Sequence, residues 1–202
     1  MRNWVADFRT MARSIAPLAA LVALAMTATC TAHDSEVGDN REGDRPDFSV
    51  YDLGSAWRDQ SSAPRTLSSL KGHPQLLALV YTSCVSTCPL TVSAMQLVEA
   101  KASGDVGFVL VSLDPARDGP AQLTEFAKQH GLSSRWTLLS GDEKSVRELA
   151  AVLGVKYRRV SPNEIDHTST LTVLDSAGRT VAQFAETDAA DRAVQALQRL
   201  GR

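Results

Sequence analysis

The amino-acid sequence predicts an α/β fold in which a central mixed sheet is flanked by helices and the chain finishes with an antiparallel hairpin and a helix. Residues 75–81 and 107–113 are near-continuous apolar runs, as expected for strands that are covered on both faces of a sheet. Residues 171–174 and 180–184 are shorter strand-like runs, joined through the turn-forming residues 176–178. Parallel strands with crossover helices are therefore expected first, and an antiparallel hairpin last.

Helix signals follow each of the two long apolar runs. Pro89 suits the first helical position, where a helix needs no backbone N–H, and predicts a helix over residues 90–102 that ends before Gly104. A second helix is predicted between Pro120 and Gly131.

The remaining elements complete the order. A short strand is predicted at residues 137–139, and Ser140 followed by Glu143 forms a capping-box pattern before a helix that stops at Gly154. The last helix, at about residues 188–200, places apolar side chains on one face. This order of strands and helices is typical of a thioredoxin-like fold with one inserted element.

Composition limits the classes of partner. The chain has 202 residues, of which 44% are hydrophobic, so it can build one sizeable core. Its formal net charge is −2, and its basic residues are scattered rather than clustered. No nucleic-acid partner is therefore expected.

The first 30 residues are predicted to be an export segment. Arginines precede an apolar run at residues 15–26, which is too short to span a membrane comfortably. Cys30 follows it, as in bacterial lipoprotein signals, and its lipidation would anchor the chain at the periplasmic face of the inner membrane. The alternatives are cleavage by the ordinary signal peptidase, or retention of the segment as an anchor, with Cys30 incidental. Residues 31–45 are polar and predict a flexible tether, followed by a domain at residues 46–202.

Three cysteines in an exported chain leave an odd one, which lipidation of Cys30 would explain. The other two, Cys84 and Cys88, lie where the first buried strand turns into a helix. Free backbone N–H groups and the helix dipole favour a thiolate there, and the i, i+4 spacing lets both sulfurs face one side. In an oxidising compartment such a pair can be a Cys84–Cys88 disulfide, a redox dithiol or a soft-metal site.

His167 is the third candidate residue of this site. It precedes the strand at residues 171–174, and in a thioredoxin-like topology the loop before that strand packs against the cysteine loop. Two thiolates and one imidazole form a compact, soft set of ligands that suits Cu(I) and can also take Cu(II).

Other residues near these positions have both a functional and an ordinary interpretation. Asp166 either orients His167 by hydrogen bonding or satisfies a local turn. Asp114 either reaches the cysteine loop or, with Asp118, caps the turn before the next helix. Met95 is expected in the core rather than at a metal, and Tyr81 is expected to be a packing residue.

Several segments, in order across residues 47–200, resemble the SCO/SenC family of copper chaperones for cytochrome c oxidase. The matching segments are Leu79-Val80-Tyr81-Thr82-Ser83-Cys84 with Cys88-Pro89, residues 111–118 (VSLDPARD), Asp166-His167-Thr168, and residues 174–179 (LDSAGR). The resemblance implies a thioredoxin fold and copper bound by Cys84, Cys88 and His167. It also implies delivery to the binuclear copper centre of the oxidase, or reduction of that centre's cysteines. The expected partner is the copper-receiving subunit of the oxidase or another exported copper protein.

The chain departs from the family pattern in two places. Val85, Ser86 and Thr87 stand where family members commonly have a proline and then an acidic residue. Residues 161–166 also form a shorter approach to His167 than is usual. Both changes affect how the site is presented, and both leave the three candidate ligands in place.

Three functions are compatible with these residues. The first is a copper-binding metallochaperone. The second is a thiol–disulfide oxidoreductase, in which Cys84 and Cys88 are the redox pair that reduces cysteines of an exported target. The third is a peroxide-reducing enzyme of the same fold, which needs a low-pKa cysteine with an arginine beside it, and no arginine is next to the pair in the sequence.

Overall fold

The computed structural model describes residues 48–185 and 189–201. The predicted export segment, the lipidation of Cys30 and the tether fall outside these residues and stay predictions. Within the described part of the chain, none of the helices has the length and apolar character needed to cross a membrane.

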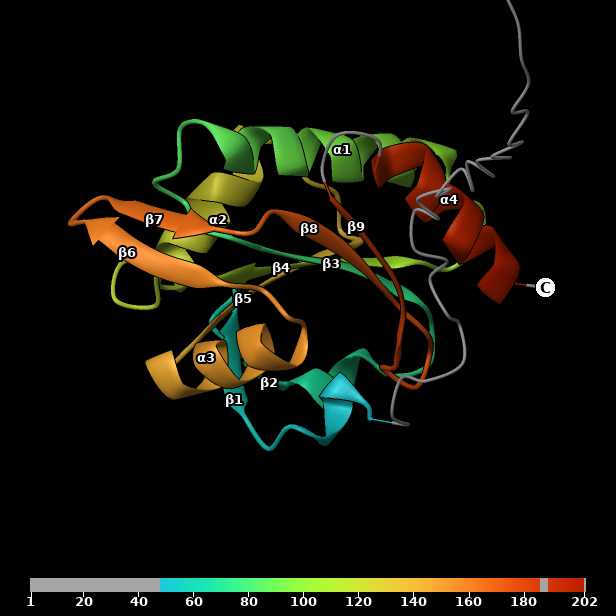
Figure 1. Cartoon of the computed structure of the whole chain (residues 1–202), viewed down its shortest axis with the longest axis horizontal. Helices are drawn as coiled ribbons and strands as arrows, with labels where there is room; N and C mark the ends of the chain where they lie inside the picture. Colours follow the sequence, from blue (N-terminus) through green and yellow to red (C-terminus); the bar gives the residue numbers. More distant parts are fainter. Residues whose placement is uncertain (1–47, 186–188, 202) are drawn as a thin grey trace, which may run out of the picture. The chain divides into compact units, whose positions relative to one another are not determined.

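A seven-stranded mixed sheet forms the centre of the folded unit (Figure 1). The strand order is β2-β1-β5-β4-β3-β8-β9, in which β3, β4 and β5 are parallel and the other neighbours pair antiparallel. The strands are β1 (Ala56–Asp59), β2 (Pro64–Thr66), β3 (Gln75–Val80), β4 (Gly107–Ser112), β5 (Trp136–Gly141), β8 (Thr170–Leu174) and β9 (Thr180–Ala185).

Helices cover both faces of this sheet (Figure 1). On one face lie α1 (Thr87–Lys101), α2 (Pro120–Gln129) and α4 (Ala189–Leu200), and on the other lies α3 (Glu143–Val152). Two short 3-10 helices, η1 (Val50–Asp52) and η2 (Leu67–Leu70), precede β3. This arrangement confirms the predicted α/β, thioredoxin-like fold with a central mixed sheet and a C-terminal hairpin and helix.

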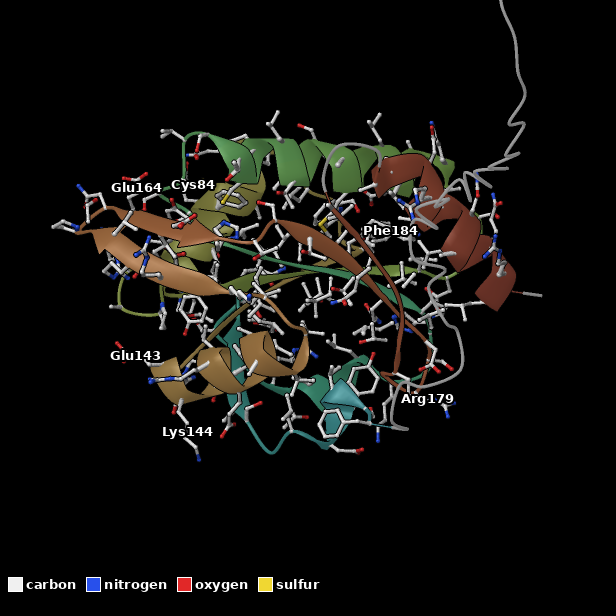
Figure 2. The ribbon with its side chains drawn as sticks, in the orientation of Figure 1. Cys84, Glu143, Lys144, Glu164, Arg179 and Phe184 are labelled. Atoms are coloured by element: carbon white, nitrogen blue, oxygen red, sulfur yellow. The ribbon has the colours of Figure 1, made fainter. Side chains whose placement is uncertain are left out.

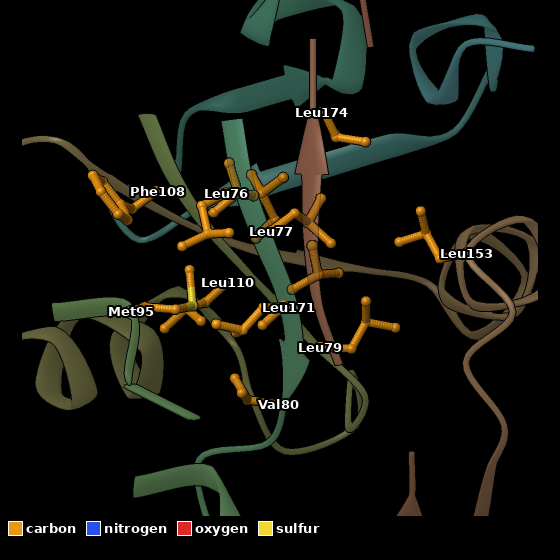
Figure 3. Close-up of a cluster of buried hydrophobic side chains, with 14 of the residues drawn as sticks. Leu76, Leu77, Leu79, Val80, Met95, Phe108, Leu110, Leu153, Leu171 and Leu174 are labelled. Carbon is orange, nitrogen blue, oxygen red and sulfur yellow. The ribbon is translucent and has the colours of Figure 1, made fainter. Parts of the chain in front are cut away.

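The core lies between the sheet and its helices. Every residue of β3 and β4 is buried, because these central strands have helices on both sides. Leu76, Leu110 and Leu171, from three different strands, gather with Met95 of α1 in one apolar cluster (Figure 3). Met95 is fully buried, which confirms its predicted place in the core.

Two predicted helix starts are wrong. Helix α1 begins at Thr87, so Pro89 is its third residue and not its first, although it still lies in the first turn, where no N–H is needed. Ser140 does not cap α3, because β5 continues through it to pair with Arg58 of β1. Asp142 caps α3 instead, and its side chain accepts a hydrogen bond from the Ser145 N–H at 2.7 Å.

A separate two-stranded sheet was not predicted. It consists of β6 (Tyr157–Ser161) and β7 (Glu164–His167), paired antiparallel. Most of its side chains are exposed or half-buried. The segment therefore lacks the long apolar runs that predict the central strands from the sequence. His167 is consequently the last residue of a strand and not part of a loop.

The topology brings three segments to one edge of the main sheet. β3 and β4 are parallel, with Val80 opposite Ser112, so their following loops leave the sheet together. β8 runs antiparallel to β3, so the chain enters β8 at this same edge. The cysteine loop, the segment after β4 and the end of β7 therefore meet where open α/β sheets commonly place their sites.

Candidate metal centre

The cysteine loop joins β3 to α1. Its turn is closed by the Cys84 N–H, which donates to the Tyr81 carbonyl at 3.2 Å. Cys88 is the second residue of α1 and is fully buried, whereas Cys84 is 7% exposed. The Cys88 N–H donates to the Cys84 sulfur at 3.3 Å, so the sulfur satisfies one of the N–H groups that a helix start leaves unpaired. No disulfide joins Cys84 and Cys88.

Hydrogen bonds make Cys84 unusually acidic. Burial raises the pKa of the Cys84 thiol, but hydrogen bonds from the side chain and backbone of Cys88, from the Ser86 backbone and from the Thr87 side chain outweigh it. The pKa falls from 9.0 to about 6. The Thr87 hydroxyl lies 3.6 Å from the sulfur. Cys84 is therefore mostly a thiolate at neutral pH, as predicted for a cysteine at a helix start.

The end of β7 brings His167 to the cysteine pair. Its Nε2 atom lies 3.9 Å from the Cys88 sulfur, and its Nδ1 atom lies 3.4 Å from the Thr168 carbonyl oxygen. The structure thus brings His167 to Cys88, whose N–H is bonded to the Cys84 sulfur, although 79 positions separate Cys88 from His167.

The donor atoms fit a soft metal ion. Bonds of about 2.3 Å from a thiolate and about 2.0 Å from an imidazole to a first-row ion add up to about 4.3 Å. The Cys88 sulfur and the His167 nitrogen are closer than this, at 3.9 Å, so one ion with a bent bond angle can join them. Among the described residues, no three His, Cys, Asp or Glu side chains are already close enough together to hold an ion.

A cleft of about 340 Å³ lies beside these residues, between the cysteine loop and the β6–β7 hairpin. Figure 2 shows Cys84 and Glu164 at this same end of the unit. Val85, in the cysteine loop, is 93% exposed. The cleft gives another molecule access to the site, and its lining residues are Tyr81, Ser86, Thr87, Val160, Glu164, Ile165, Asp166 and His167.

Tyr81 has a role that sequence analysis missed. Its hydroxyl oxygen accepts a hydrogen bond from the Ile165 N–H at 3.3 Å, and its ring packs edge-on against the His167 ring at 6.0 Å between centroids. Burial raises the pKa of Tyr81, which keeps the hydroxyl neutral. The sequence signal for this role was the position of Tyr81 directly after β3 and three residues before Cys84.

The acidic residues near the site have structural partners. The carboxylate of Asp118 accepts hydrogen bonds from Thr82, and that of Asp114 pairs with Arg117 and Arg159. Neither caps α2, whose N-terminal flanking residue is Gly119 with no side-chain cap. Asp166 lies 3.7 Å from Arg158, its partner across the hairpin.

Comparison with known proteins gives concordant matches. The profile of the SCO1/SenC family matches residues 52–202. A SCO2-like protein of Rickettsia conorii is 30% identical over 135 residues, which are 62% of this chain and 65% of that protein. The match thus spans slightly less than two thirds of that relative.

Solved structures share the fold. ScoI of Bradyrhizobium japonicum, whose structure has copper bound, is 27% identical with a TM-score of 0.63, over 72% of this chain and 96% of that one. BsSco is described as a member of the Sco family of cytochrome c oxidase assembly proteins with a disulfide switch. It is 22% identical with a TM-score of 0.66, over 78% of this chain and 95% of that one. The family profile covers well over half of the chain, and on this ground the chain belongs to the SCO1/SenC family.

Proposed function

We propose that this protein is a copper metallochaperone that holds one copper ion between the thiolates of Cys84 and Cys88 and the imidazole of His167. The observation that carries the proposal is the 3.9 Å approach of the His167 Nε2 atom to the Cys88 sulfur. Thiolate and imidazole ligands together select copper over hard cations such as Mg²⁺. The copper-bound structure of ScoI from B. japonicum supports the choice of metal.

Each ligand is prepared differently for its role. Cys84 has a pKa of about 6, so copper need displace few protons from it at neutral pH. Cys88 is shielded from solvent, which protects a bound soft ion from competing water. His167 is steadied by the edge of the Tyr81 ring, so that its Nε2 atom is directed at the pair.

Copper is cargo in this proposal, and it leaves for a second protein. The recipient is the copper-receiving subunit of cytochrome c oxidase or another exported copper protein, reached at the periplasmic face of the inner membrane. Family membership and the described role of BsSco in oxidase assembly support this assignment. The predicted export segment, with an N-terminal membrane anchor, would keep the domain near such a recipient.

A Cu(I) titration tests the three-ligand site. The reduced full chain, competing with a chromophoric Cu(I) chelator, should bind one equivalent. His167→Ala should weaken binding at least tenfold. The matched control is His73→Ala. His73 precedes the start of β3, whereas the cysteine loop follows its end, and it contacts Asp105 at 3.8 Å. Unchanged affinity in His167→Ala would refute the site.

A thiol–disulfide oxidoreductase is the second candidate, favoured by the low pKa of Cys84. In this reaction the Cys84 thiolate attacks a target disulfide and releases one target thiolate. Cys88 then loses its proton and attacks the mixed disulfide, which releases the second target thiolate and leaves a Cys84–Cys88 disulfide. Two electrons pass to the target, and an external thiol reductant restores the pair. A reversible redox titration with turnover of a disulfide substrate, in protein that binds no Cu(I), would favour this function.

A further inference from the structure

The turn at residues 114–118 contacts both halves of the candidate site. It follows β4 at the edge of the sheet, and it is closed by the N–H groups of Arg117 and Asp118, which donate to the Asp114 carbonyl at 3.0 and 2.9 Å. The side chains of Asp114 and Asp118 are both buried, with at most 1% exposed. Buried carboxylates are costly unless they are hydrogen-bonded, so their partners define what the turn holds.

One arm of the turn reaches the cysteine loop. The two carboxylate oxygens of Asp118 accept hydrogen bonds from the backbone N–H and the hydroxyl of Thr82, at 2.9 and 2.5 Å. The Ser112 hydroxyl donates to the same carboxylate at 2.5 Å. Thr82 stands two residues before Cys84, so this arm fixes where the cysteine loop leaves β3.

The other arm reaches the hairpin that carries His167. The Asp114 carboxylate accepts hydrogen bonds from Arg159 of β6 at 2.6 Å and from Arg117 at 2.6 Å. Arg117 also donates to the side-chain oxygen of Asn163, in the turn between β6 and β7, at 2.7 Å. Hydrogen bonds from the turn at residues 114–118 thus hold the hairpin at β6 and at the turn between β6 and β7.

Hairpin pairing carries this restraint to the histidine. Arg159 lies opposite Ile165, and Tyr157 lies opposite His167, so fixing β6 fixes the register and the position of β7. Short, charge-assisted hydrogen bonds have a narrow geometry, which makes them suitable restraints for such a connection.

We propose that the turn at residues 114–118 is the positioning element that sets the separation of the cysteine pair from His167. Asp118 holds the cysteine side, and Asp114 with Arg117 holds the histidine side. The proposal deepens the proposed function and rests on it, since the separation matters because one copper ion must reach both sides.

Substitutions in each arm test the role in the full chain. Asp118→Asn and Arg159→Met should each lower Cu(I) affinity at least fivefold. The matched control is Asp59→Asn, because Asp59 is also a buried carboxylate, with donors from Ser61, Ala63 and Arg65, but it belongs to β1, which β5 and β4 separate from β3 in the sheet. At a similar loss of thermal stability, the control should keep wild-type affinity. Thr82→Val should resemble Asp118→Asn, and Thr82→Ser, which keeps the hydroxyl, should not.

Two measurements without copper separate this proposal from the proposed function. Amide exchange across residues 157–167 should rise in Arg159→Met and stay unchanged in Asp118→Asn. In a Cys30→Ser background, the alkylation rate of Cys84 should change in Asp118→Asn and stay at the wild-type value in Arg159→Met. The positioning role is overturned if both variants match Asp59→Asn in these readouts and in copper affinity. If the wild-type chain binds no copper while each variant still shows its own change, the metallochaperone is refuted and the positioning role stands.

Discussion

At the scale of single residues, the sulfur of Cys84 does two things at once. It accepts the Cys88 N–H at the start of α1, and it is the acidic thiol of the pair. The same hydrogen bonds therefore order the loop and stabilise the negative charge. A titration of this thiol reports directly on both.

The alkylation rate of Cys84 should follow its low pKa. In reduced, copper-free protein that carries Cys30→Ser, the rate should rise with pH and reach half its maximum near pH 6. The cause is that only the thiolate reacts with an alkylating reagent. A midpoint near 8.5, the value of a free cysteine, would contradict the hydrogen-bonded arrangement.

The same shift predicts a pH dependence of stability. The folded-state pKa of Cys84 lies below its ordinary value of 9.0, so between these values the unfolded chain binds one more proton than the folded chain. The stability due to this thiolate is complete above pH 9 and is lost as the pH falls through about 6. The thermal midpoint of the reduced protein should thus gain a rising component between about pH 6 and 9, which Cys84→Ser should remove.

Removal of the Tyr81 hydroxyl should loosen the hairpin. Tyr81→Phe leaves the Ile165 N–H without its acceptor, at a cost of about 1–3 kcal/mol in the free energy of unfolding. Tyr51→Phe is the matched control, since that buried hydroxyl donates to the Leu70 carbonyl at 3.2 Å. Urea unfolding should show losses in both variants. Amide exchange of Ile165 should rise only in Tyr81→Phe, and equal exchange in the two variants would count against the contact.

At the scale of elements, helix α1 joins the core to the site. Its first turn carries Cys88, and Met95 on its inner face is fully buried. A thioether this deep in the apolar cluster is a packing group.

Replacement of Met95 should separate packing from metal binding. Met95→Leu keeps the volume of the side chain and should cost less than about 1.5 kcal/mol. Met95→Ala should cost about 2–5 kcal/mol because it leaves a cavity. Urea unfolding measures both losses. The stoichiometry and affinity for Cu(I) should be unchanged in Met95→Leu, and a tenfold loss would identify the sulfur as a ligand.

Some elements of the fold could be predicted from the sequence and others could not, for physical reasons. β3, β4 and α1 could be predicted, because burial on both faces demands long apolar runs and because a proline marks the first turn of a helix. The β6–β7 hairpin could not, since its stability comes from Arg159, Asn163 and Ile165 contacting residues far away in the sequence. Ser140 misled because its local capping pattern was overridden by pairing with β1.

At the scale of the whole molecule, strand order decides where the candidate site lies. The exit from β3, the exit from β4 and the entry to β8 share one edge of the sheet. The meeting of His167 with the cysteines could therefore be predicted from topology alone. The contacts of Tyr81 and Asp118 could not, because they depend on how the loops pack at that edge.

Copper binding should stabilise the whole folded unit. An ion that binds only the native state adds about 2.7 kcal/mol at a free concentration a hundred times the dissociation constant. For a domain of this size, that corresponds to a rise of roughly 5–10 °C in the thermal midpoint. Calorimetry of the reduced chain with Cu(I) should show the rise, and Cys88→Ser should abolish it. A rise that persists in Cys88→Ser would place the ion elsewhere.

The N–H group of Cys88 that donates to the Cys84 sulfur has a consequence for the release of cargo. If the ion alone neutralised the two cysteine thiolates, its release would be unfavourable, because two uncompensated negative charges would remain. Here one sulfur is already compensated by the peptide dipole at the beginning of the helix. In the proposed metallochaperone, this compensation would make the empty site less costly and would so reduce the free energy needed to give the ion to the next protein.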